Sequence, residues 1–399
     1  MSCTRLTRRE WFGCTAKAAA GLYLARPRWV LASRAPAAPV AIAGCRSYGS
    51  ELLPAMERMF DQLGGLGRLV KGKTVAIKLN LTGSPTYRMG YVPLGLAQWV
   101  HPRVVSATVH CLARAGAHRI RLLESPWATT ESLEEFIWQA NWDPQEILSA
   151  GPRVEFENTN YLGRGKRYSR LWVPNGGHMF KAFDLNHSYE DCDVFVSLAK
   201  LKEHLTAGVT LSMKNCFGIT PCTIYGVGSG EEEPSLEPQG GRAPFHDGSR
   251  QPSRSALPEN DPKSPREGGY RVPRIVADLV AARPIQLAII DGIETMAGGE
   301  GPWVPGGQAV KPGIMVAGTN PVCTDAVATA LMNFDPMGDR GTPPFETCDS
   351  TLRLGEEHGI GTRDLKRIEV VGGRIGALKF DFAELRLQRQ RSRQNQSSS

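Results

Sequence analysis

The sequence contains nine cysteines, but no two of them stand three positions apart. The Cys-x-x-Cys spacing of zinc sites and the ligand spacing of iron–sulfur clusters are therefore absent. The eight histidines show no His-x-x-x-His pair, which excludes the usual helical zinc motif. Most of the cysteines have apolar neighbours, and this context favours buried free thiols.

Signatures of serine hydrolases and of dinucleotide binding are also missing. No Gly-x-Ser-x-Gly elbow occurs in the chain. No Gly-x-Gly-x-x-Gly lies between a predicted strand and a predicted helix, and the glycine-rich loop Gly298–Pro302 is not followed by Gly-Lys-Ser/Thr. These segments therefore do not support nucleotide binding.

The net charge of +7 does not lie on the predicted folded core. Residues 1–37 carry seven basic side chains against one acidic, and residues 384–399 carry four against one. These ends hold +6 and +3, which leaves −2 for the chain between them. A nucleic-acid-binding protein concentrates basic charge on its folded domain, so we expect no nucleic-acid partner. No apolar run is long enough to predict a transmembrane span.

The first residues resemble a twin-arginine export signal. Arg8 and Arg9 precede a modestly apolar stretch at 14–25, and an Ala-Pro-Ala sequence at 35–37 offers a small-residue cleavage site. We therefore expect residues 1–37 to be an export signal that is recognised by the twin-arginine export machinery. The mature protein would then be periplasmic or otherwise exported.

Ile42–Cys45 matches the cleavage box of a lipoprotein, with Cys45 as the residue that would carry the lipid. Its apolar run begins only after Arg34, and residues 40–43 have equally the pattern of a first strand. We prefer the strand to a lipid anchor at Cys45.

Apolar runs typical of strands alternate with segments of helical periodicity along most of the chain. The predicted strands lie at 40–43, 73–79, 119–123, 194–198, 285–290, 313–317 and 367–371, and the predicted helices at 51–63, 101–115, 131–140, 270–282 and 321–333. This alternation predicts an α/β fold with a largely parallel sheet, covered by helices on both faces. We assign it to one domain over residues 38–385.

Two segments differ in composition from this domain. Residues 226–269 are rich in glycine, proline, serine and glutamate and have few large apolar side chains. Such a segment buries too little apolar surface to order itself, so we predict a flexible insertion. Residues 386–399 are polar throughout, and we predict a disordered tail.

The most informative stretch covers residues 194–221. Its first five residues predict a buried strand, and Lys200, Lys202 and His204 follow at a spacing of two. Residues 209–214 then alternate between apolar and polar, which predicts an extended segment that presents Lys214 on its polar face.

Lysines are rarely fully buried unless they are paired, so these basic side chains suggest a bound anion or a network with carboxylates. The alternative is an exposed edge strand that lysines protect from aggregation. Asn215 and the next three residues follow at once, and this run is more typical of a turn into a packed loop.

In open α/β sheets, ligands bind beyond the carboxyl ends of the strands. Functional side chains stand at five predicted strand ends, which are Lys78 with Asn80, Glu124 with Ser125, Lys200 with Lys202 and His204, Asp291 with Glu294, and Asn320. Buried lysines need acids nearby. Asp291, Glu294, Glu300 and Asp325 could supply them.

These residues lie in segments that resemble the family named domain of unknown function 362. The matching segments are K-T-V-A-I-K-L-N-L, K-L-K-E-H…K-N-C-F-G, I-I-D-G-I-E…G-G-E-G-P and T-N-P-V-C-T-D-A-V-A, within residues 40–371. The resemblance strengthens the candidate site residues Lys78, Asn80, Lys200, Lys202, His204, Lys214, Asn215, Asp291, Glu300 and Asp325. It implies no reaction. Some such proteins are fused to iron–sulfur domains, whose cysteines this chain lacks, and the insertion at 226–269 departs from the pattern.

We therefore expect an exported enzyme that acts on a small anionic substrate, a carboxylate or a phosphate. Lys202 and Lys214 would hold the anion, together with the other candidate binding residues. His204 would be the general acid–base because its pKa lies near operating pH. Asp291 would orient it.

A divalent metal is a further expectation, with Glu300 and Asp325 as its ligands. The rival class is a non-catalytic binding protein for an anionic ligand or cofactor. In a third reading, the charged stretch is an internal network of salt bridges with no ligand.

Overall fold

The computed structural model describes residues 35–127, 131–229 and 240–397. All elements named below belong to one compact unit, residues 36–399. The predicted twin-arginine motif lies outside the described residues.

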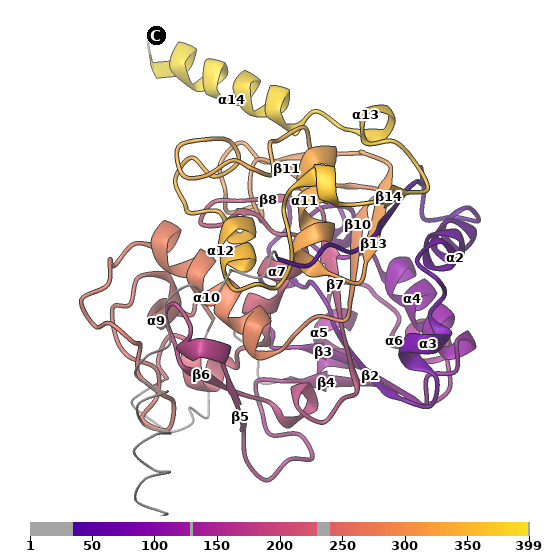
Figure 1. Cartoon of the computed structure of the whole chain (residues 1–399), viewed down its shortest axis with the longest axis horizontal. Coiled ribbons are helices and arrows are strands. Elements are labelled where there is room, and N and C mark those ends of the chain that lie inside the picture. Colours follow the sequence, from indigo (N-terminus) through magenta and orange to yellow (C-terminus); the bar gives the residue numbers. More distant parts are fainter. Residues whose placement is uncertain (1–34, 128–130, 230–239, 398–399) are drawn as a thin grey trace, which may run out of the picture. The chain divides into compact units, whose positions relative to one another are not determined.

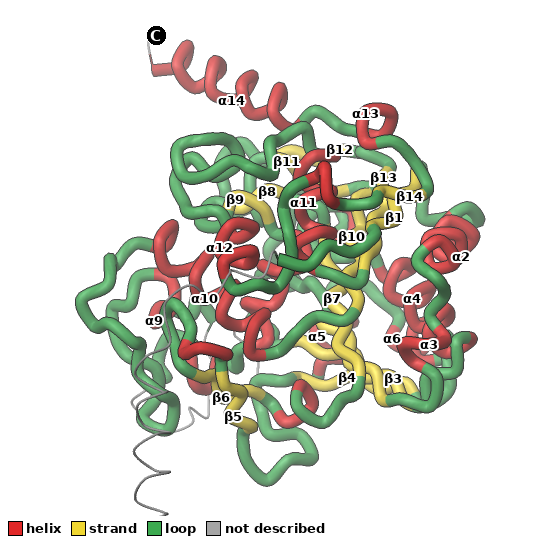
Figure 2. Tube along the Cα trace, viewed as in Figure 1, coloured by secondary structure: helices red, strands yellow, loops and turns green. Residues whose placement is uncertain are grey.

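One eight-stranded sheet organises this unit (Figure 1, Figure 2), with the strand order β14-β1-β13-β10-β7-β2-β3-β4. Its strands are β1 (Val40–Gly44), β2 (Thr74–Lys78), β3 (Arg119–Glu124), β4 (Val154–Asn158), β7 (Val194–Lys200), β10 (Leu287–Gly292), β13 (Ile314–Gly318) and β14 (Val370–Val371). The sheet is parallel except at β13, which is antiparallel to both of its neighbours. The predicted α/β fold with a largely parallel sheet is confirmed.

Helices cover both faces of the sheet (Figure 1), as predicted. One face carries α2 (Leu52–Gln62), α3 (Gly67–Val70), α4 (Pro102–Arg114), α5 (Leu133–Trp138) and α6 (Pro144–Leu148). The other carries α7 (Leu211–Asn215), α8 (Cys222–Tyr225), α9 (Ala243–His246), α10 (Gly268–Ala282), α11 (Pro321–Leu331) and α12 (Thr351–Glu357). Strand β7 lies in the middle and sends alternate side chains into the two cores, as a strand buried on both faces must.

Shorter elements complete the unit. Three two-stranded ribbons consist of β5 (Ser169–Trp172) with β6 (Ala182–Leu185), β8 (Glu203–His204) with β9 (Gly208–Val209), and β11 (Thr295–Ala297) with β12 (Gln308–Val310). The 3₁₀ turns are η1 (Leu94–Leu96), η2 (Pro174–Gly176), η3 (His187–Tyr189), η4 (Cys216–Ile219) and η5 (Leu365–Arg367), and the last helices are α13 (Ile375–Leu378) and α14 (Phe382–Ser397). None of the helices in the described residues is long and apolar enough to cross a membrane.

The predicted extended segment at 209–214 is wrong. Strand β9 ends at Val209, and the helix α7 begins at Leu211. The carboxylate of Asp325 explains the change, because it accepts hydrogen bonds from the backbone N–H groups of Ser212 (2.9 Å) and Met213 (2.8 Å). A carboxylate at this place satisfies the free N–H groups of a helix start, and a distant residue therefore decides the local structure.

The exposed-edge alternative for the central lysines is also wrong. Strand β7 pairs with β2 on one side and with β10 on the other. The side chains of Lys200 and Lys202 have no exposed surface, and Lys214 is buried.

The insertion packs against the rest of the unit in its described part, residues 226–229 and 240–269. Phe245 is fully buried and contacts the aromatic rings of Phe180 and Phe217. Glu259 is buried and pairs with Arg271 on α10 at 2.7 Å. One aromatic anchor and a buried ion pair thus order a segment whose average composition predicts disorder.

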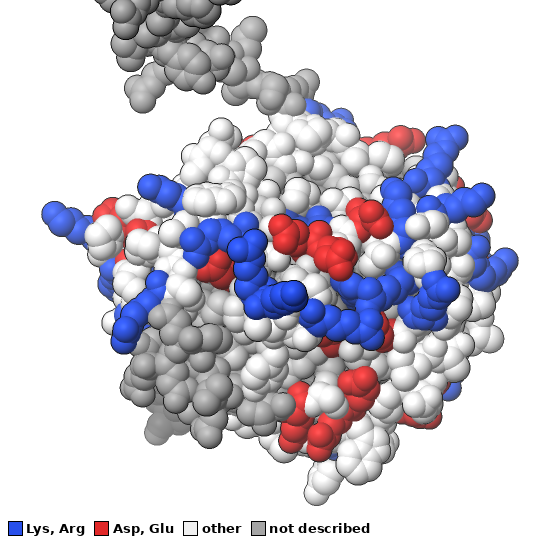
Figure 3. Space-filling model, turned by 90° about the horizontal axis from the view of Figure 1, so that it is seen from below, with Lys and Arg blue, Asp and Glu red and all other residues white. Residues whose placement is uncertain are grey.

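The tail beyond residue 385 continues the helix α14 in the described residues. Arg386 and Arg389 of α14 pair with the buried Glu203 of β8 at 2.9 and 3.0 Å. Two cations thus compensate one buried carboxylate. Basic and acidic side chains both occur on the face shown in Figure 3, where lysines and arginines form a band between acidic groups.

Candidate functional site

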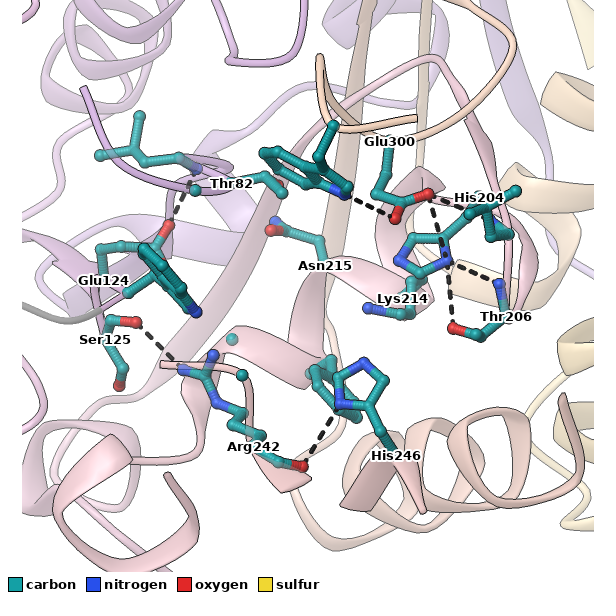
Figure 4. A pocket seen from close by; sticks show the side chains of 18 of the residues that line it. Thr82, Glu124, Ser125, His204, Thr206, Lys214, Asn215, Arg242, His246 and Glu300 are labelled. Atoms are coloured by element: carbon teal, nitrogen blue, oxygen red, sulfur yellow. Dashed lines mark hydrogen bonds and ion pairs between the residues drawn. The ribbon is translucent and has the colours of Figure 1, made fainter. Parts of the chain in front are cut away.

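A cavity of about 540 Å³ opens beyond the carboxyl ends of β2, β3 and β7. Figure 4 shows side chains around it from β3, from β8, from α7 and from the insertion. Five of the predicted site residues line the cavity, namely Lys78, His204, Lys214, Asn215 and Glu300. The other five do not line it, namely Asn80, Lys200, Lys202, Asp291 and Asp325.

Lys78 and Glu124 form a buried ion pair at one end of the cavity. The Lys78 amine lies 2.5 Å from the Glu124 carboxylate, and both side chains are almost fully buried. Burial lowers the pKa of Lys78, and Glu124 opposes this effect. A Cβ atom on Gly218 would lie 2.9 Å from the Lys78 amine, so an alanine there would have to displace the end of the Lys78 side chain.

Asn215 joins the ends of β2 and β7. Its side-chain N–H group donates to the Ser197 hydroxyl (3.1 Å) and to the Leu198 carbonyl (3.3 Å). Its amide oxygen accepts from Asn80 (3.1 Å) and from Lys78 (3.3 Å). Asn215 and Asn80 therefore hold the site in place through a saturated set of hydrogen bonds.

Lys200 pairs with Asp291 behind the cavity. Their charged atoms are 2.9 Å apart, and neither side chain is exposed. Asp291 also accepts hydrogen bonds from the Tyr48 hydroxyl (3.0 Å) and the His101 backbone N–H (3.0 Å). The charge of Asp291 is thus occupied, and its described contacts do not include the imidazole of His204.

Lys202 is satisfied by neutral oxygens. Its amine donates to the backbone carbonyls of Gln98 (2.6 Å) and Glu300 (3.0 Å) and to the Thr82 hydroxyl (3.3 Å). Burial lowers the pKa of Lys202 well below its ordinary value. These three acceptors match the three donors of an ammonium group, so Lys202 ties the loop of Glu300 to the end of β7.

Lys214 differs from the other three buried lysines in the described residues. No carboxylate there lies within ion-pair distance of its amine, which faces the ring of Phe217 at 4.1 Å from the centroid. Figure 4 shows the Lys214 amine and the Arg242 guanidinium directed into the same space. Burial, with further repulsion from Arg242 and Lys78, lowers the pKa of Lys214 to about 7 although Glu300 opposes the shift.

His204 and Glu300 face each other across another wall of the cavity, with 3.9 Å between Nδ1 and a carboxylate oxygen. Nδ1 of His204 accepts the backbone N–H of Thr206 at 3.2 Å, which places the proton of the neutral ring on Nε2. Burial and the charge of Lys214 lower the pKa of His204 well below its ordinary value.

Glu300 remains ionised. Burial raises its pKa, but the positive charge that His204 carries when protonated and the N–H donors of Leu205 and Trp303 outweigh burial and lower the pKa to about 2. A carboxylate is therefore held 3.9 Å from a neutral imidazole.

Two lining residues from the insertion were not among the predicted candidates. Arg242 is buried, and its guanidinium donates to the backbone carbonyls of Ser125 (3.0 Å) and Thr220 (2.9 Å). Nδ1 of His246 lies 3.3 Å from the Arg242 carbonyl oxygen. Burial and the charge of Lys214 lower the pKa of His246 to about 4, so its ring is neutral near pH 7. Both residues lie in a segment whose composition predicts disorder, and no local signal marks them.

Aromatic side chains form the remaining walls and the mouth. Tyr87 lies 5.3 Å from the ring of Trp127 and 6.1 Å from the ring of Trp303, measured between centroids. Phe217 lies beneath Lys214. Flat apolar walls with a few charged groups are typical of sites for small organic ligands.

Asp325 and Glu300, the predicted metal ligands, have different partners in the described residues. Both oxygens of Asp325 are used at the start of α7, where the Ser212 hydroxyl also donates to it at 2.6 Å. Burial raises the pKa of Asp325 to about 7. Its place beneath α7 indicates a structural role.

The segment Gly67–Thr74 matches the pattern Gly-x-x-x-x-Gly-Lys-Thr of a phosphate-binding loop. Such a loop leads from a strand into a helix. Here α3 comes first and β2 follows, so the match is at the amino end of a strand and away from the cavity. The structure does not support phosphate binding there.

The model of the family described as domain of unknown function (DUF362) matches residues 75–330, more than half of the chain. The chain therefore belongs to this family. It is 28% identical over 187 residues to a thylakoid-associated protein of Synechocystis sp. (strain ATCC 27184 / PCC 6803 / Kazusa). This match covers 46% of the chain and 50% of that relative, so the chain spans about half of the relative's length.

A solved structure of a protein from Thermotoga maritima also matches, with 14% sequence identity and a TM-score of 0.31. The match covers 61% of this chain and 51% of that chain.

Proposed function

We propose that the protein is an enzyme that acts on a small anionic substrate, a carboxylate or a phosphate, in the 540 Å³ cavity. One observation carries the proposal, which is that the Lys214 amine faces the cavity without an acidic partner among the described residues. A buried ammonium without a counter-charge is costly. A bound anion would remove that cost.

The charges of the lining support a substrate with one negative charge. The described lining contains three permanent or potential cations, Lys78, Lys214 and Arg242, against the two carboxylates of Glu124 and Glu300. The excess is one positive charge when Lys214 is protonated. The tryptophan and tyrosine rings at the mouth suit a planar apolar body attached to the anionic group.

His204 is the proposed acid–base group. Its neutral ring carries the proton on Nε2 and has Glu300 beside Nδ1, so a proton taken up by the ring would be stabilised by that carboxylate. Glu300 therefore takes the orienting role that the sequence suggested for Asp291, whose charge is used by Lys200.

Proton uptake on binding tests the anion site directly. The pKa of Lys214 is about 7 in the empty cavity, and a bound anion would raise it. At pH 8, binding of benzoate, which stays a monoanion throughout this range, should therefore take up close to one proton, and at pH 6 close to none. Calorimetry in two buffers of different ionisation enthalpy measures this number.

Matched variants distinguish the site from general charge effects. Lys214→Met should abolish binding and the associated proton uptake. Lys311→Met, which changes an amine that is 75% exposed, should leave both unchanged. Binding with no proton uptake at pH 8, or uptake that persists in Lys214→Met, would contradict the assignment of Lys214.

The rival function is a binding protein without turnover. His204→Gln separates the two, because glutamine keeps a polar group but cannot exchange a proton near pH 7. For an enzyme, the variant should retain anion binding and lose turnover of the substrate found by screening anionic metabolites. Turnover at the wild-type rate in His204→Gln would rule out the acid–base role.

A further inference from the structure

Outside the cavity, two histidines and one aspartate converge at the junction of the η2 loop, α10 and α12. One ring nitrogen from each of His178 and His358 and a carboxylate oxygen of Asp278 lie within 4.8 Å of one another. His178 follows η2, Asp278 lies in α10, and His358 caps the end of α12. The three residues come from distant parts of the chain, so the cluster could not be predicted from the spacing of residues in the sequence.

One ring nitrogen of the cluster has no hydrogen-bond partner among the described residues. Nε2 of His178 is buried and has no hydrogen-bond partner among the described residues. The ring of His178 packs against the ring of His358 at 4.3 Å between centroids. A buried unpartnered polar atom costs free energy, so a missing ligand at this atom is a physical explanation.

Hydrogen bonds fix the position of the Asp278 carboxylate beside the two imidazole rings. It has no exposed surface and accepts backbone N–H groups of His178 (2.6 Å), Met179 (2.7 Å) and Phe180 (3.1 Å). Its ionisable partner in the described residues is His358, whose Nε2 lies 2.9 Å from Oδ1. A buried carboxylate needs compensating charge, which a bound cation would supply.

We propose that His178, Asp278 and His358 bind a divalent transition metal ion, with zinc as the best-matched ion. Two imidazoles and one carboxylate form a known ligand set for zinc, with a fourth position for water. The ion would replace the proton between His358 and Asp278 and would use a ring nitrogen of His178. Ligands of one tetrahedral zinc lie roughly 3.3 Å apart, as follows from bond lengths of about 2.0–2.1 Å. The 2.9 Å contact between His358 and Asp278 is close to this value, and all three ligand atoms lie within 4.8 Å of one another.

Such an ion would stabilise the packing of the insertion against the rest of the unit. The segment that follows η2 pairs with the insertion, since Phe180 forms a β-bridge with Glu259 and the Asn260 N–H donates to the Met179 carbonyl at 2.7 Å. The insertion also carries Arg242 and His246, which line the cavity. Metal binding at the cluster should therefore protect residues 240–269 from proteolysis.

The test uses the full chain, freed of metal by chelation, with Zn²⁺ or Co²⁺ added alone. Calorimetry should give one ion per chain, and Co²⁺ should give visible absorption bands without the near-ultraviolet charge transfer of a thiolate ligand. His178→Gln and His358→Gln should each weaken binding by at least about 10–100-fold, the loss typical even for outer-shell partners. The proteolytic protection of residues 240–269 should disappear in parallel.

His118→Gln is the matched control, because His118 is exposed and lies on another part of the fold. It should bind the metal as the wild type does. Failure of the wild type to bind one ion would overturn the proposal, as would thiolate bands or unchanged affinity in both cluster variants. Loss of binding in Glu300→Gln with retention in the two histidine variants would place the ion in the cavity and would also overturn it.

Discussion

Replacement of Lys214 by methionine should leave the protein as stable as the wild type or make it more stable. Lys214 is buried, and no carboxylate of the described residues lies within ion-pair distance of its amine. The substitution therefore leaves no partner charge stranded. Methionine has a similar length and packs well against an aromatic ring such as that of Phe217.

The size of the expected change in stability follows from the pKa of Lys214. The shift from 10.5 to about 7 corresponds to a cost of about 5 kcal/mol for the protonated amine at low pH, at 1.36 kcal/mol per pKa unit. The contact with the Phe217 ring returns up to about 2 kcal/mol in a desolvated setting. We therefore expect Lys214→Met to raise the free energy of unfolding by up to about 3 kcal/mol at pH 6.

The pH dependence gives the sharper test. Between pH 7 and pH 10.5 the unfolded chain holds more protons on Lys214 than the folded chain, so folding becomes more favourable as the pH rises. Below pH 7 both states are protonated and the full cost is present. The advantage of Lys214→Met should thus shrink by about 1.4 kcal/mol per pH unit within this window.

Urea unfolding at pH 6, 7.5 and 9 measures these differences. Lys200→Met is the matched control, because it removes a lysine whose Asp291 partner lies 2.9 Å away with no exposed surface. It should cost roughly 3–5 kcal/mol, since a buried charge is left unpaired. A Lys214→Met protein that is destabilised as strongly as Lys200→Met, or a difference from wild type that is constant with pH, would refute the reasoning.

Three further predictions concern the site, the insertion and the export signal. Gly218→Ala should lower the free energy of unfolding by about 1–3 kcal/mol through overpacking and should weaken anion binding, because the new Cβ would lie 2.9 Å from the Lys78 amine. Gly376→Ala, whose Cβ would have no atom within 4 Å, is the control, and equal melting temperatures of the two variants would count against the tight fit at Gly218. In the same urea experiment, Phe245→Ala should lower the free energy of unfolding by about 3–5 kcal/mol, whereas Val227→Ala, at 42% exposure in the same insertion, should change it by less than about 0.5 kcal/mol. An unchanged free energy of unfolding in Phe245→Ala would favour the prediction that the insertion is flexible. Replacement of both Arg8 and Arg9 by lysine should retain the protein in the cytoplasm on cell fractionation if the proposed twin-arginine signal is used, and unchanged export would reject it.

The sheet was predictable because its strands are buried on both faces and therefore read as continuous apolar runs. Strands β2, β3, β7, β10 and β13 lie where the apolar runs predict them. The carboxyl-end rule then placed the cavity at the correct edge of the sheet, with Lys78 and His204 in its lining.

The errors arose where contacts distant in sequence decide the outcome. Residues 209–214 alternate like a strand, but Asp325 binds the N–H groups that start α7. Arg242 and His246 reach the cavity because Phe245 between them is anchored in the core. Average composition over forty residues conceals a single anchor of this kind.

The lysines show why residue type alone could not rank the site candidates. The described residues contain four buried lysines, and all four were predicted binding residues, with Lys202 and Lys214 as the groups that would hold the anion. Lys78 and Lys200 are neutralised by Glu124 and Asp291, and Lys202 is saturated by three neutral oxygens.

Lys214 alone among these four has neither a carboxylate nor a neutral oxygen within bonding distance of its amine in the described residues. A fold does not gain stability from such a charge, since an apolar side chain of similar volume would pack there at lower cost. Its presence is therefore better explained by a ligand than by the needs of folding. If that explanation holds, saturating concentrations of the anion should reverse the order of stability, so that the wild type becomes more stable than Lys214→Met by mass action.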